Sequence, residues 1–507
     1  MRIAIVTENF LPKVDGVTRT LAKLLEHLQA TNHEVILFGP ESKMETYANA
    51  KLYGTAGIPF LPYPELKLNI WRPTFTKRLI EFKPQVIHLV DPVFMGAALL
   101  AVLRLHRLKI PVVSSYHTNL STYCTAFGWG IFANLMWVWN RHCHSQCRYT
   151  VCPSESTRKN LREKGLKNVR IWPRGIDMSL FSPEHRSERL RSQWLLQSKK
   201  LTRGKKEEDE NGEDENRTEI VTEEEEEEEK NSMTTMTNDK ENKTILLYVG
   251  RVSFEKNLGL VIDSYRDMDY QRCHLVIVGH GPALEELKIL CQQYNLPVTF
   301  TGYLGGHELA TAFASADIFV FPSYTETFGQ VVLESMASGL PVVGLLAEGV
   351  RDLVRDQETG LLLDVTNMSK QEQAIKYRHL LNMLIEDREL RYKMKRNALE
   401  RCKSYTWWNA MEDMVQVYRD TVVLENSNEG KEEEEEERVK SKVIVDEEKE
   451  TDLTEVIIEP KDRLPPVDDH TVEHEQSFTH HDSIGIIPTH HKSLSSVNEG
   501  VNQSASC

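Results

Sequence analysis

Residues 317–343, DIFVFPSYTETFGQVVLESMASGLPVV, contain the pattern that decides the fold. The apolar run at 317–323 predicts a buried strand, and the polar, glycine-containing stretch after it predicts a loop. A helix is expected at 330–337, and the apolar run LPVVGL at 340–345 predicts the next strand. Aliphatic strands that alternate with helices are typical of a parallel sheet covered on both faces.

The same alternation extends outward from this stretch and divides most of the chain into two α/β blocks. The other strands predicted in the second block are TILLYVGR (244–251), HLVIVGHG (274–281) and VTFTGYL (298–304), with helices at Leu258–Asp267, Ala283–Tyr294 and Gly306–Ser315. The first block has a predicted helix at Val17–Gln29 and strands RIAIVTE (2–8), EVILFGP (34–40), VIHLVDP (86–92) and PVVSSYHT (111–118). We therefore expect two doubly wound Rossmann-like domains facing a central cleft, with ligands at the carboxyl ends of the strands.

Charge marks the boundaries of these domains. The chain has 507 residues and a net charge of −15, but two acidic stretches carry −8 (199–243) and −14 (425–507), which leaves +7 elsewhere. Neither stretch has enough apolar surface to fold, so both are predicted to be disordered. The predicted folded parts are a first domain at 1–198, a second at 244–405 and a helix at 406–424 that packs back on the first domain.

The mildly basic folded part suits an anionic partner, such as a sugar diphosphate or an acidic membrane surface, although +7 is also ordinary for this length. No nucleic-acid partner is predicted. The chain opens directly on a strand, and no apolar run reaches the ~18–20 residues of a membrane span. We expect a cytoplasmic protein, either free or peripheral on the cytosolic face of a membrane.

The eight cysteines are scattered, which indicates reduced, intracellular usage rather than a disulfide scaffold. Their one local cluster, RHCHSQC, contains Cys143, His144 and Cys147. Zinc would need a fourth ligand from elsewhere in the chain, so buried helix cysteines are the favoured interpretation and no metal site is predicted.

The second block carries the candidate binding residues. Glu326 lies on the loop after a strand, and Glu334 lies two turns into the following helix. The loop amides around Phe328, Gly329, Gln330 and Val331 are expected to point from the helix N-terminus toward a diphosphate. Two glutamates alone would be ordinary solvated carboxylates. However, VGRVSFEKN adds Arg251 and Lys256 after the first strand of the block, and such cations suit a leaving diphosphate.

Taken together, GR…EKN, VGHGP, FTGYL, ADIFVFPSYTETFG, VVLESMASGLPVV and TGLLLD resemble glycosyltransferase family 4, enzymes of the GT-B fold. The resemblance covers residues 1–198 and 244–423. It implies that Arg251 and Lys256 bind the donor diphosphate, that Glu326 contacts the donor sugar and that Glu334 contacts the ribose. It also places Gly279, in GHGP, at the donor site.

The first block fits this resemblance. Gly16 lies on the loop after the first strand, where a missing side chain would let the backbone approach a phosphate. The loop lacks the G-x-G-x-x-G pattern, which disfavours a nicotinamide-dependent oxidoreductase. His117, in SSYHT, is expected to contact the transferred sugar and joins Arg251, Lys256 and Glu326 in the predicted catalytic set.

Three further positions bear on the resemblance. Arg174 belongs to WPRGIDMSLFSP, which resembles the family's segment leading out of the first domain. His280 stands where the family often has an acidic residue, and Glu348 stands where many members have a glycine. Both departures fall on loops near the donor and bear on donor identity.

The resemblance implies transfer with retained stereochemistry. In that reaction a donor phosphate oxygen takes the acceptor's proton while Arg251 and Lys256 stabilise the departing diphosphate. No D-x-D dipeptide follows a strand in either block, so no metal or other cofactor is predicted. The pattern looks most like GDP-mannose-dependent mannosyltransferases acting on glycolipids, with UDP-sugar-dependent sulfoquinovosyl or glucosyl transfer to diacylglycerol as the alternative.

Other interpretations remain open from the sequence. A nucleotide-sugar epimerase or a non-catalytic sugar-nucleotide-binding protein would share the fold. The acceptor is expected to be a lipid or glycan. The aromatic segment FGWGIFANLMWVWNR, with Trp129, Phe132, Trp137 and Trp139, suits docking on a membrane, but it is also consistent with a buried helix.

Overall fold

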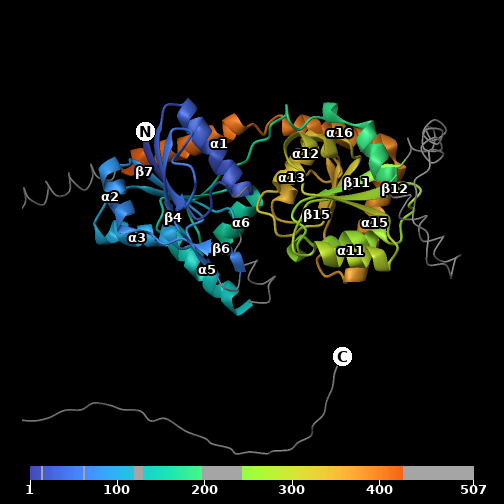
Figure 1. The fold of residues 1–507 in the computed structure, drawn as a ribbon, viewed down its shortest axis with the longest axis horizontal. Coiled ribbons are helices and arrows are strands. Elements are labelled where there is room, and N and C mark those ends of the chain that lie inside the picture. The colour runs from blue at the N-terminus through green and yellow to red at the C-terminus, as the bar shows by residue number, and fades with distance from the viewer. Residues whose placement is uncertain (13–14, 61–62, 119–129, 197–242, 426, 428–507) are drawn as a thin grey trace, which may run out of the picture. The chain divides into compact units, whose positions relative to one another are not determined.

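The computed structural model describes residues 1–12, 15–60, 63–118, 130–196, 243–425 and 427. The described residues form one compact unit that contains two α/β lobes, the first drawn mainly in blue to cyan and the second mainly in green to orange in Figure 1. The predicted acidic insert and acidic tail lie outside the described residues, apart from Lys243 and residues 425 and 427.

The first lobe is built on an eight-stranded sheet with the order β10-β9-β8-β7-β1-β2-β4-β3, parallel except for β3. Its strands are β1 (Arg2–Thr7), β2 (Glu34–Pro40), β3 (Thr46–Tyr47), β4 (Ala50–Thr55), β7 (Val86–Val90), β8 (Val112–Ser115), β9 (Tyr149–Cys152) and β10 (Val169–Ile171), and a separate hairpin is formed by β5 (Ile58–Phe60) and β6 (Tyr63–Leu68). Its helices are α1 (Gly16–Ala30), α2 (Pro73–Phe82), α3 (Met95–Leu105), α5 (Gly130–Ser145) and α6 (Glu155–Glu163).

Both faces of this sheet are buried, as the sequence predicts. Successive side chains of β1 point to opposite faces, so Ile3 and Ile5 join one core while Ala4 and Val6 join the other. At the start of α1, the Asp15 carboxylate accepts hydrogen bonds from two backbone amides of the first turn, which fixes where the helix begins.

The second lobe has an all-parallel sheet with the order β13-β12-β11-β14-β15-β16. Its strands are β11 (Thr244–Val249), β12 (Cys273–Val278), β13 (Val298–Gly302), β14 (Ile318–Phe321), β15 (Val342–Leu345) and β16 (Gly360–Leu363). Its helices are α10 (Leu258–Tyr265), α11 (Leu284–Gln293), α12 (Gly306–Ala314), α13 (Gln330–Ala337), α14 (Val350–Leu353), α15 (Lys370–Glu386) and α16 (Arg388–Cys402), with short 3-10 turns at η1 (Pro183–His185) and η2 (Phe254–Lys256).

Counted along the chain, the second sheet has the order 3-2-1-4-5-6 of a doubly wound fold. The chain reverses direction across the sheet between β11 and β14. In the first sheet the corresponding reversal lies between β1 and β7. Open parallel sheets bind ligands at such switch points, beside the carboxyl ends of the strands. The two doubly wound lobes predicted from the sequence are therefore confirmed.

A helix at 407–425 returns the chain to the first lobe. Met411, Met414 and Tyr418 from this helix are buried in the same core as Ile3 and Leu24. The indole Nε1–H of Trp172 donates a hydrogen bond to the carbonyl oxygen of Ala410 at 3.0 Å.

The segment just after residue 175 corrects the predicted boundary at 198. Ile176, Phe181 and Trp194 pack into the core of the second lobe, not the first. Arg191, also in this segment, forms an ion pair with Asp317 at 2.9 Å, directly before β14. The spacing of apolar residues in this segment is consistent with packing against either lobe. Only the long-range contacts of Phe181, Trp194 and Arg191 assign it to the second lobe.

Candidate active site

Lys256 and Glu326 meet at the switch point of the second sheet. Lys256 ends the turn η2 after β11, and Glu326 lies on the loop after β14, the strand next to β11. Their side chains form an ion pair, and both are largely buried, with 14% and 20% of the side chain exposed. A cation that can reach a phosphate therefore lies directly beside an acid that can accept hydrogen bonds from sugar hydroxyls.

The loop that carries Glu326 is held in place by glycine backbone. Gly329 has φ +91 at the position before α13, a conformation that favours glycine. A Cβ on Gly349 would lie 2.8 Å from both the carbonyl oxygen of Glu326 and the amide nitrogen of Phe328. The close contact between these two loops fixes the backbone that leads into α13. That the amides of Phe328 to Val331 face a diphosphate remains a prediction.

Arg251 lies on a loop supported by a second pair of glycines. Its side chain is exposed, and its carbonyl oxygen accepts a hydrogen bond from the hydroxyl of Tyr248 at 3.0 Å. A Cβ on Gly279 would lie 1.9 Å from the carbonyl oxygen of Gly250, and Gly279 has φ +140. Gly279 thus allows the loop after β12 to pack against the backbone beside Arg251.

Glu334 is almost fully buried on α13, with 1% of its side chain exposed. Burial raises the pKa of Glu334 to about 7, and the Arg19 guanidinium, 2.6 Å away, opposes that rise. Arg19 comes from α1 of the first lobe. Sequence reasoning identified Glu334 but missed Arg19, because the contact joins residues 315 positions apart.

Gly16 and His117 lie near each other at the carboxyl edge of the first sheet, joined by Arg174. The Arg174 guanidinium donates to the Gly16 carbonyl oxygen at 3.3 Å and to Nδ1 of His117 at 2.8 Å. Gly16 is the first residue of α1 rather than a loop residue as predicted, and a Cβ there would meet no atom within 4 Å.

His117 is buried and neutral. Burial, and next to it the Arg174 guanidinium, hold the pKa of the His117 imidazole well below its usual range. Its Nε2 hydrogen bonds with the Ser115 hydroxyl at 2.8 Å, so both ring nitrogens have protein partners. A sugar hydroxyl would have to displace one of those partners to bond the ring, and the predicted sugar contact stays a prediction.

Asp91 is a functional candidate that the sequence analysis does not include, although it lies near the end of the predicted strand VIHLVDP. Its carboxylate accepts from the backbone amide of His117 at 2.7 Å and from the Thr118 hydroxyl at 2.9 Å. Burial nevertheless raises the pKa of Asp91 to about 6, against these hydrogen bonds. Asp91 thus fixes the strand end on which His117 is carried.

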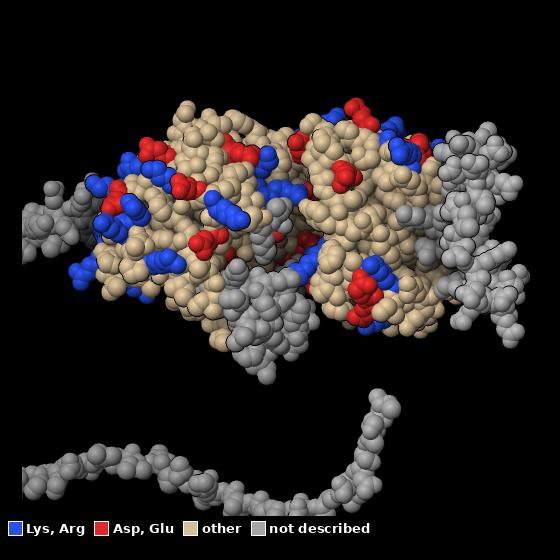
Figure 2. Space-filling model, viewed as in Figure 1, with Lys and Arg blue, Asp and Glu red and all other residues tan. Residues whose placement is uncertain are grey.

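Two of the predicted residues, His117 and Gln330, take part in hydrogen bonds between the two lobes. The Thr327 hydroxyl donates to the carbonyl oxygen of His117 at 2.8 Å, and the Gln330 side chain donates to the carbonyl oxygen of Gly175 at 3.1 Å. With the Arg19–Glu334 ion pair, these contacts bring the loop after β14 against the first lobe's carboxyl edge. Figure 2 shows basic and acidic side chains interspersed on the face drawn, rather than one field of a single sign.

Comparison with known proteins identifies the family of this chain. The family model "Glycosyltransferase Family 4" matches residues 14–180, and "Glycosyl transferases group 1" matches residues 230–401. A GDP-mannose-dependent alpha-mannosyltransferase of Corynebacterium glutamicum is 31% identical over 84% of this chain and 90% of its own length. The chain belongs to glycosyltransferase family 4.

Further relatives and solved structures are consistent with that membership. A GDP-mannose-dependent alpha-mannosyltransferase of Mycolicibacterium smegmatis is 34% identical over 72% of this chain and 85% of its own length. The Sulfoquinovosyl transferase SQD2 of Arabidopsis thaliana is 29% identical over 78% of this chain and 68% of its own length. The sucrose-phosphate synthase of Thermosynechococcus elongatus superposes with TM-score 0.60 at 18% identity, over 83% of this chain and 99% of that one. This structural likeness shows the GT-B fold.

Glu348, where many family members have a glycine, has a structural role in this glycosyltransferase. Its carboxylate accepts from the Thr157 hydroxyl at 2.6 Å and from the Asn160 amide at 2.9 Å, both on α6 of the first lobe. Asp352 likewise accepts from the amide and hydroxyl of Ser156. Glu348 and Asp352 thus both bind α6, one from the segment leading into α14 and one from α14 itself.

The Cys143–His144–Cys147 cluster is packed as core. Cys143 and Cys147 are buried beneath the first sheet, and Nδ1 of His144 hydrogen bonds with the Ser114 hydroxyl at 2.8 Å. Within the described ranges, no group of three or more histidine, cysteine or acidic side chains is placed to hold a metal ion.

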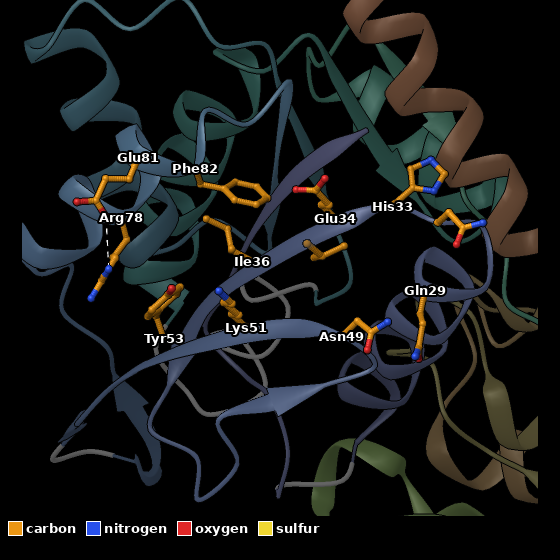
Figure 3. A pocket seen from close by; sticks show the side chains of 12 residues that line it. Gln29, His33, Glu34, Ile36, Asn49, Lys51, Tyr53, Arg78, Glu81 and Phe82 are labelled. Carbon is orange, nitrogen blue, oxygen red and sulfur yellow. Dashed lines mark hydrogen bonds and ion pairs between the residues drawn. The ribbon is translucent and has the colours of Figure 1, made fainter.

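A groove of about 570 Å³ lies elsewhere on the first lobe (Figure 3). It is lined by the end of α1, by the start of β2, by α2, where Arg78 pairs with Glu81 at 3.4 Å, and by Asn49, Lys51 and Tyr53. Because β2 begins there, the groove lies at the amino end of the sheet. It is therefore separate from the carboxyl edge where the candidate residues gather.

Proposed function

We propose that this glycosyltransferase moves a mannosyl group from GDP-mannose to a lipid-linked acceptor, with retention of configuration. The observation that carries the proposal is the Lys256–Glu326 ion pair at the switch point of the second sheet. A sugar diphosphate bound there would present its phosphates to Lys256 and its sugar hydroxyls to Glu326. The names of the relatives from Corynebacterium and Mycolicibacterium favour GDP-mannose over a UDP-sugar.

The proposed chemistry needs no nucleophile from the protein. Lys256 and Arg251 stabilise the charge that develops on the departing diphosphate, and a phosphate oxygen of the donor accepts the acceptor's proton. Glu326 and Glu334 orient the sugar and the ribose, while the first lobe presents the acceptor. In this scheme His117 and Arg174 line the acceptor side of the transferred sugar.

A lipid acceptor is supported by the surface of α5. This helix exposes three apolar side chains on neighbouring positions of its surface: Leu135 (63% exposed), Val138 (53%) and Trp139 (41%). Such an apolar strip suits contact with lipid. Trp137 instead packs against the core beside Lys164, whose Nζ lies 4.7 Å from the ring centre. Trp129 and the Phe132 side chain lie outside the described residues.

Two features limit how the strip would be used. On the face drawn in Figure 2 the charges are mixed, so attraction to an anionic surface has no support there. No helix in the described part of the chain is long and apolar enough to cross a bilayer. Contact with lipid would therefore rest on side chains that insert at the interface.

The test is a donor panel of GDP-mannose, UDP-glucose and UDP-sulfoquinovose, incubated with and without lipid acceptor. We expect acceptor-dependent release of GDP from GDP-mannose and an α-linked product by NMR. A β-linked product would refute retention, and turnover with a UDP-sugar alone would refute the donor. A sugar altered without any acceptor would indicate an epimerase, and binding without turnover would indicate an inactive protein.

Lys256→Ala tests the site itself. Removing a cation that stabilises a leaving group is expected to lower kcat about 100-fold or more while the thermal midpoint stays close to that of the wild type. Lys393→Ala, an exposed lysine on α16 of the same lobe, is the matched control and is expected to retain full activity. Equal turnover in the two variants would remove Lys256 from the site.

A further inference from the structure

A chain of buried side-chain hydrogen bonds runs from the helix at 407–425 to the candidate site. The Tyr418 hydroxyl lies 2.8 Å from Nδ1 of His88, and Nε2 of His88 lies 2.9 Å from the Ser115 hydroxyl. The same hydroxyl lies 2.8 Å from Nε2 of His117, whose Nδ1 accepts from Arg174 at 2.8 Å. The hydrogen-bond chain thus ends on His117 and Arg174, which the proposed function places beside the transferred sugar.

The direction of every hydrogen bond in this chain of bonds can be worked out from the Arg174 guanidinium at its end. A guanidinium can only donate, so Nδ1 of His117 must accept and its Nε2 must carry the proton. Nε2 of His117 then donates to Ser115. Within the described part of the chain, the Ser115 hydroxyl has one remaining partner, Nε2 of His88, so it donates there. His88 is left with its proton on Nδ1, which donates to Tyr418.

The members of the chain have little freedom to rearrange. His88 and Ser115 are fully buried, and Tyr418 has no exposed surface. The Trp172 ring contacts both histidines edge to face, with ring centres 5.6 Å from His88 and 5.5 Å from His117. Trp172 also donates to the carbonyl oxygen of Ala410, so the helix at 407–425 constrains the histidines through two separate contacts.

The His117 end of the hydrogen-bond chain reaches the second lobe. The carbonyl oxygen of His117 accepts from the Thr327 hydroxyl at 2.8 Å, next to Glu326. The residue whose ring ends the hydrogen-bond chain thus also contacts, through its backbone, the loop that carries the predicted sugar-binding acid. The helix at 407–425 is therefore linked, through Tyr418, His88, Ser115 and His117, to the loop of the second lobe that carries Thr327.

We propose that Tyr418 is a positioning residue for glycosyl transfer, acting through His88 and Ser115 to hold His117 and Arg174 in place. The proposal rests on the proposed function for its effect on catalysis, but the hydrogen-bond chain itself can be tested without turnover. Tyr418 does not touch the reacting atoms. Its removal should therefore affect kcat more than the KM for the donor.

The experiment compares Tyr418→Phe with Tyr377→Phe. Tyr377 is equally buried and donates to the carbonyl oxygen of Val343 at 2.7 Å, in the second lobe. Both variants lose one buried hydroxyl with its hydrogen bond, but only the first breaks the chain to His117. We expect Tyr418→Phe to lower kcat about tenfold, with donor KM changed less than about twofold, and Tyr377→Phe to leave both unchanged.

The second readout is the ¹⁵N spectrum of histidine-labelled protein, with signals assigned from His88→Gln and His117→Gln. Without the Tyr418 hydroxyl, a proton on Nδ1 of His88 has no acceptor, so His88 is expected to move its proton to Nε2 and perturb the His117 signals. Unchanged signals for both rings would overturn the proposal, as would equal losses of kcat in the two phenylalanine variants. If the wild type were inactive with every donor, the proposed function would be overturned instead. The spectra would still test whether the hydrogen bonds link Tyr418 to His117.

Discussion

Glu334→Gln is predicted to stabilise the protein at alkaline pH, although Glu334 is expected to bind the donor. Burial raises the pKa of this carboxyl from 4.5 to about 7 in the folded protein. A carboxyl with a raised pKa binds its proton more tightly in the folded state, so the folded state loses stability as pH rises from 4.5 through 7. Relative to a carboxyl with an unshifted pKa, Glu334 lowers the free energy of unfolding by roughly 3 kcal/mol at pH 8 and by about 1 kcal/mol at pH 5.

Glutamine keeps the shape of the side chain and does not ionise, so the variant escapes this loss. Arg19 loses a charged partner, but 41% of its side chain is exposed and water can solvate it, at a cost of about 0–1 kcal/mol. The net prediction is that the advantage of Glu334→Gln over the wild type grows by about 2 kcal/mol between pH 5 and pH 8.

Urea unfolding at pH 5, 6, 7 and 8 measures this difference in the free energy of unfolding. Glu286→Gln, an exposed position on α11, is the control and should stay within about 0.5 kcal/mol of the wild type at every pH. A Glu334→Gln advantage that is the same at pH 5 and pH 8 would refute the reasoning, because the carboxyl would then not have a raised pKa. The variant should also bind the nucleotide donor more weakly, since an amide is a poorer acceptor for ribose hydroxyls than a carboxylate.

Two further predictions test other parts of the fold. Gly279→Ala places a Cβ 1.9 Å from the carbonyl oxygen of Gly250, at a residue with φ +140. The free energy of unfolding measured in urea should fall by roughly 2–3 kcal/mol. A loss below about 0.5 kcal/mol would show that the two loops separate easily. Burial raises the pKa of the Cys147 thiol to about 12, so a thiol reagent at pH 8 should leave Cys147 unmodified in the folded protein and modify it quickly in urea-unfolded protein. Mass spectrometry of the peptide that contains Cys147 measures the modification. Rapid modification in the folded state would contradict the burial of Cys147.

The sequence predicted the elements that rest on local periodicity. The helix at 330–337 was predicted with the bounds that α13 has, because a buried strand, a glycine and a regular apolar face all mark it. β9 and β10 were not predicted, since their sequences YTVC and VRI lack the continuous apolar run that marks the equally short β14, IFVF. Lys256 and Glu326 follow neighbouring strands of a doubly wound sheet, so strand order alone places them together.

What the sequence could not predict depends on contacts between distant segments. The boundary near 175 is one case, because Phe181 and Trp194 are apolar residues that either lobe's core would accept. Tyr418 is another, since nothing near it in the sequence indicates that its hydroxyl reaches His88, 330 residues away. Buried polar groups find partners wherever the fold brings them, and local pattern does not contain that information.

The same reasoning applies to the acid that the resemblance assigns to the ribose. Whether Glu334 is charged near neutral pH depends on burial within its own lobe and on Arg19 from the other lobe. Because a pKa of about 7 lies near the working range of most enzymes, modest changes in the distance to Arg19 shift the carboxyl between its two forms. In the proposed site, the position of α1 against α13 would therefore set the charge that Glu334 presents to a bound nucleotide, and the first lobe would contribute to donor binding through Arg19.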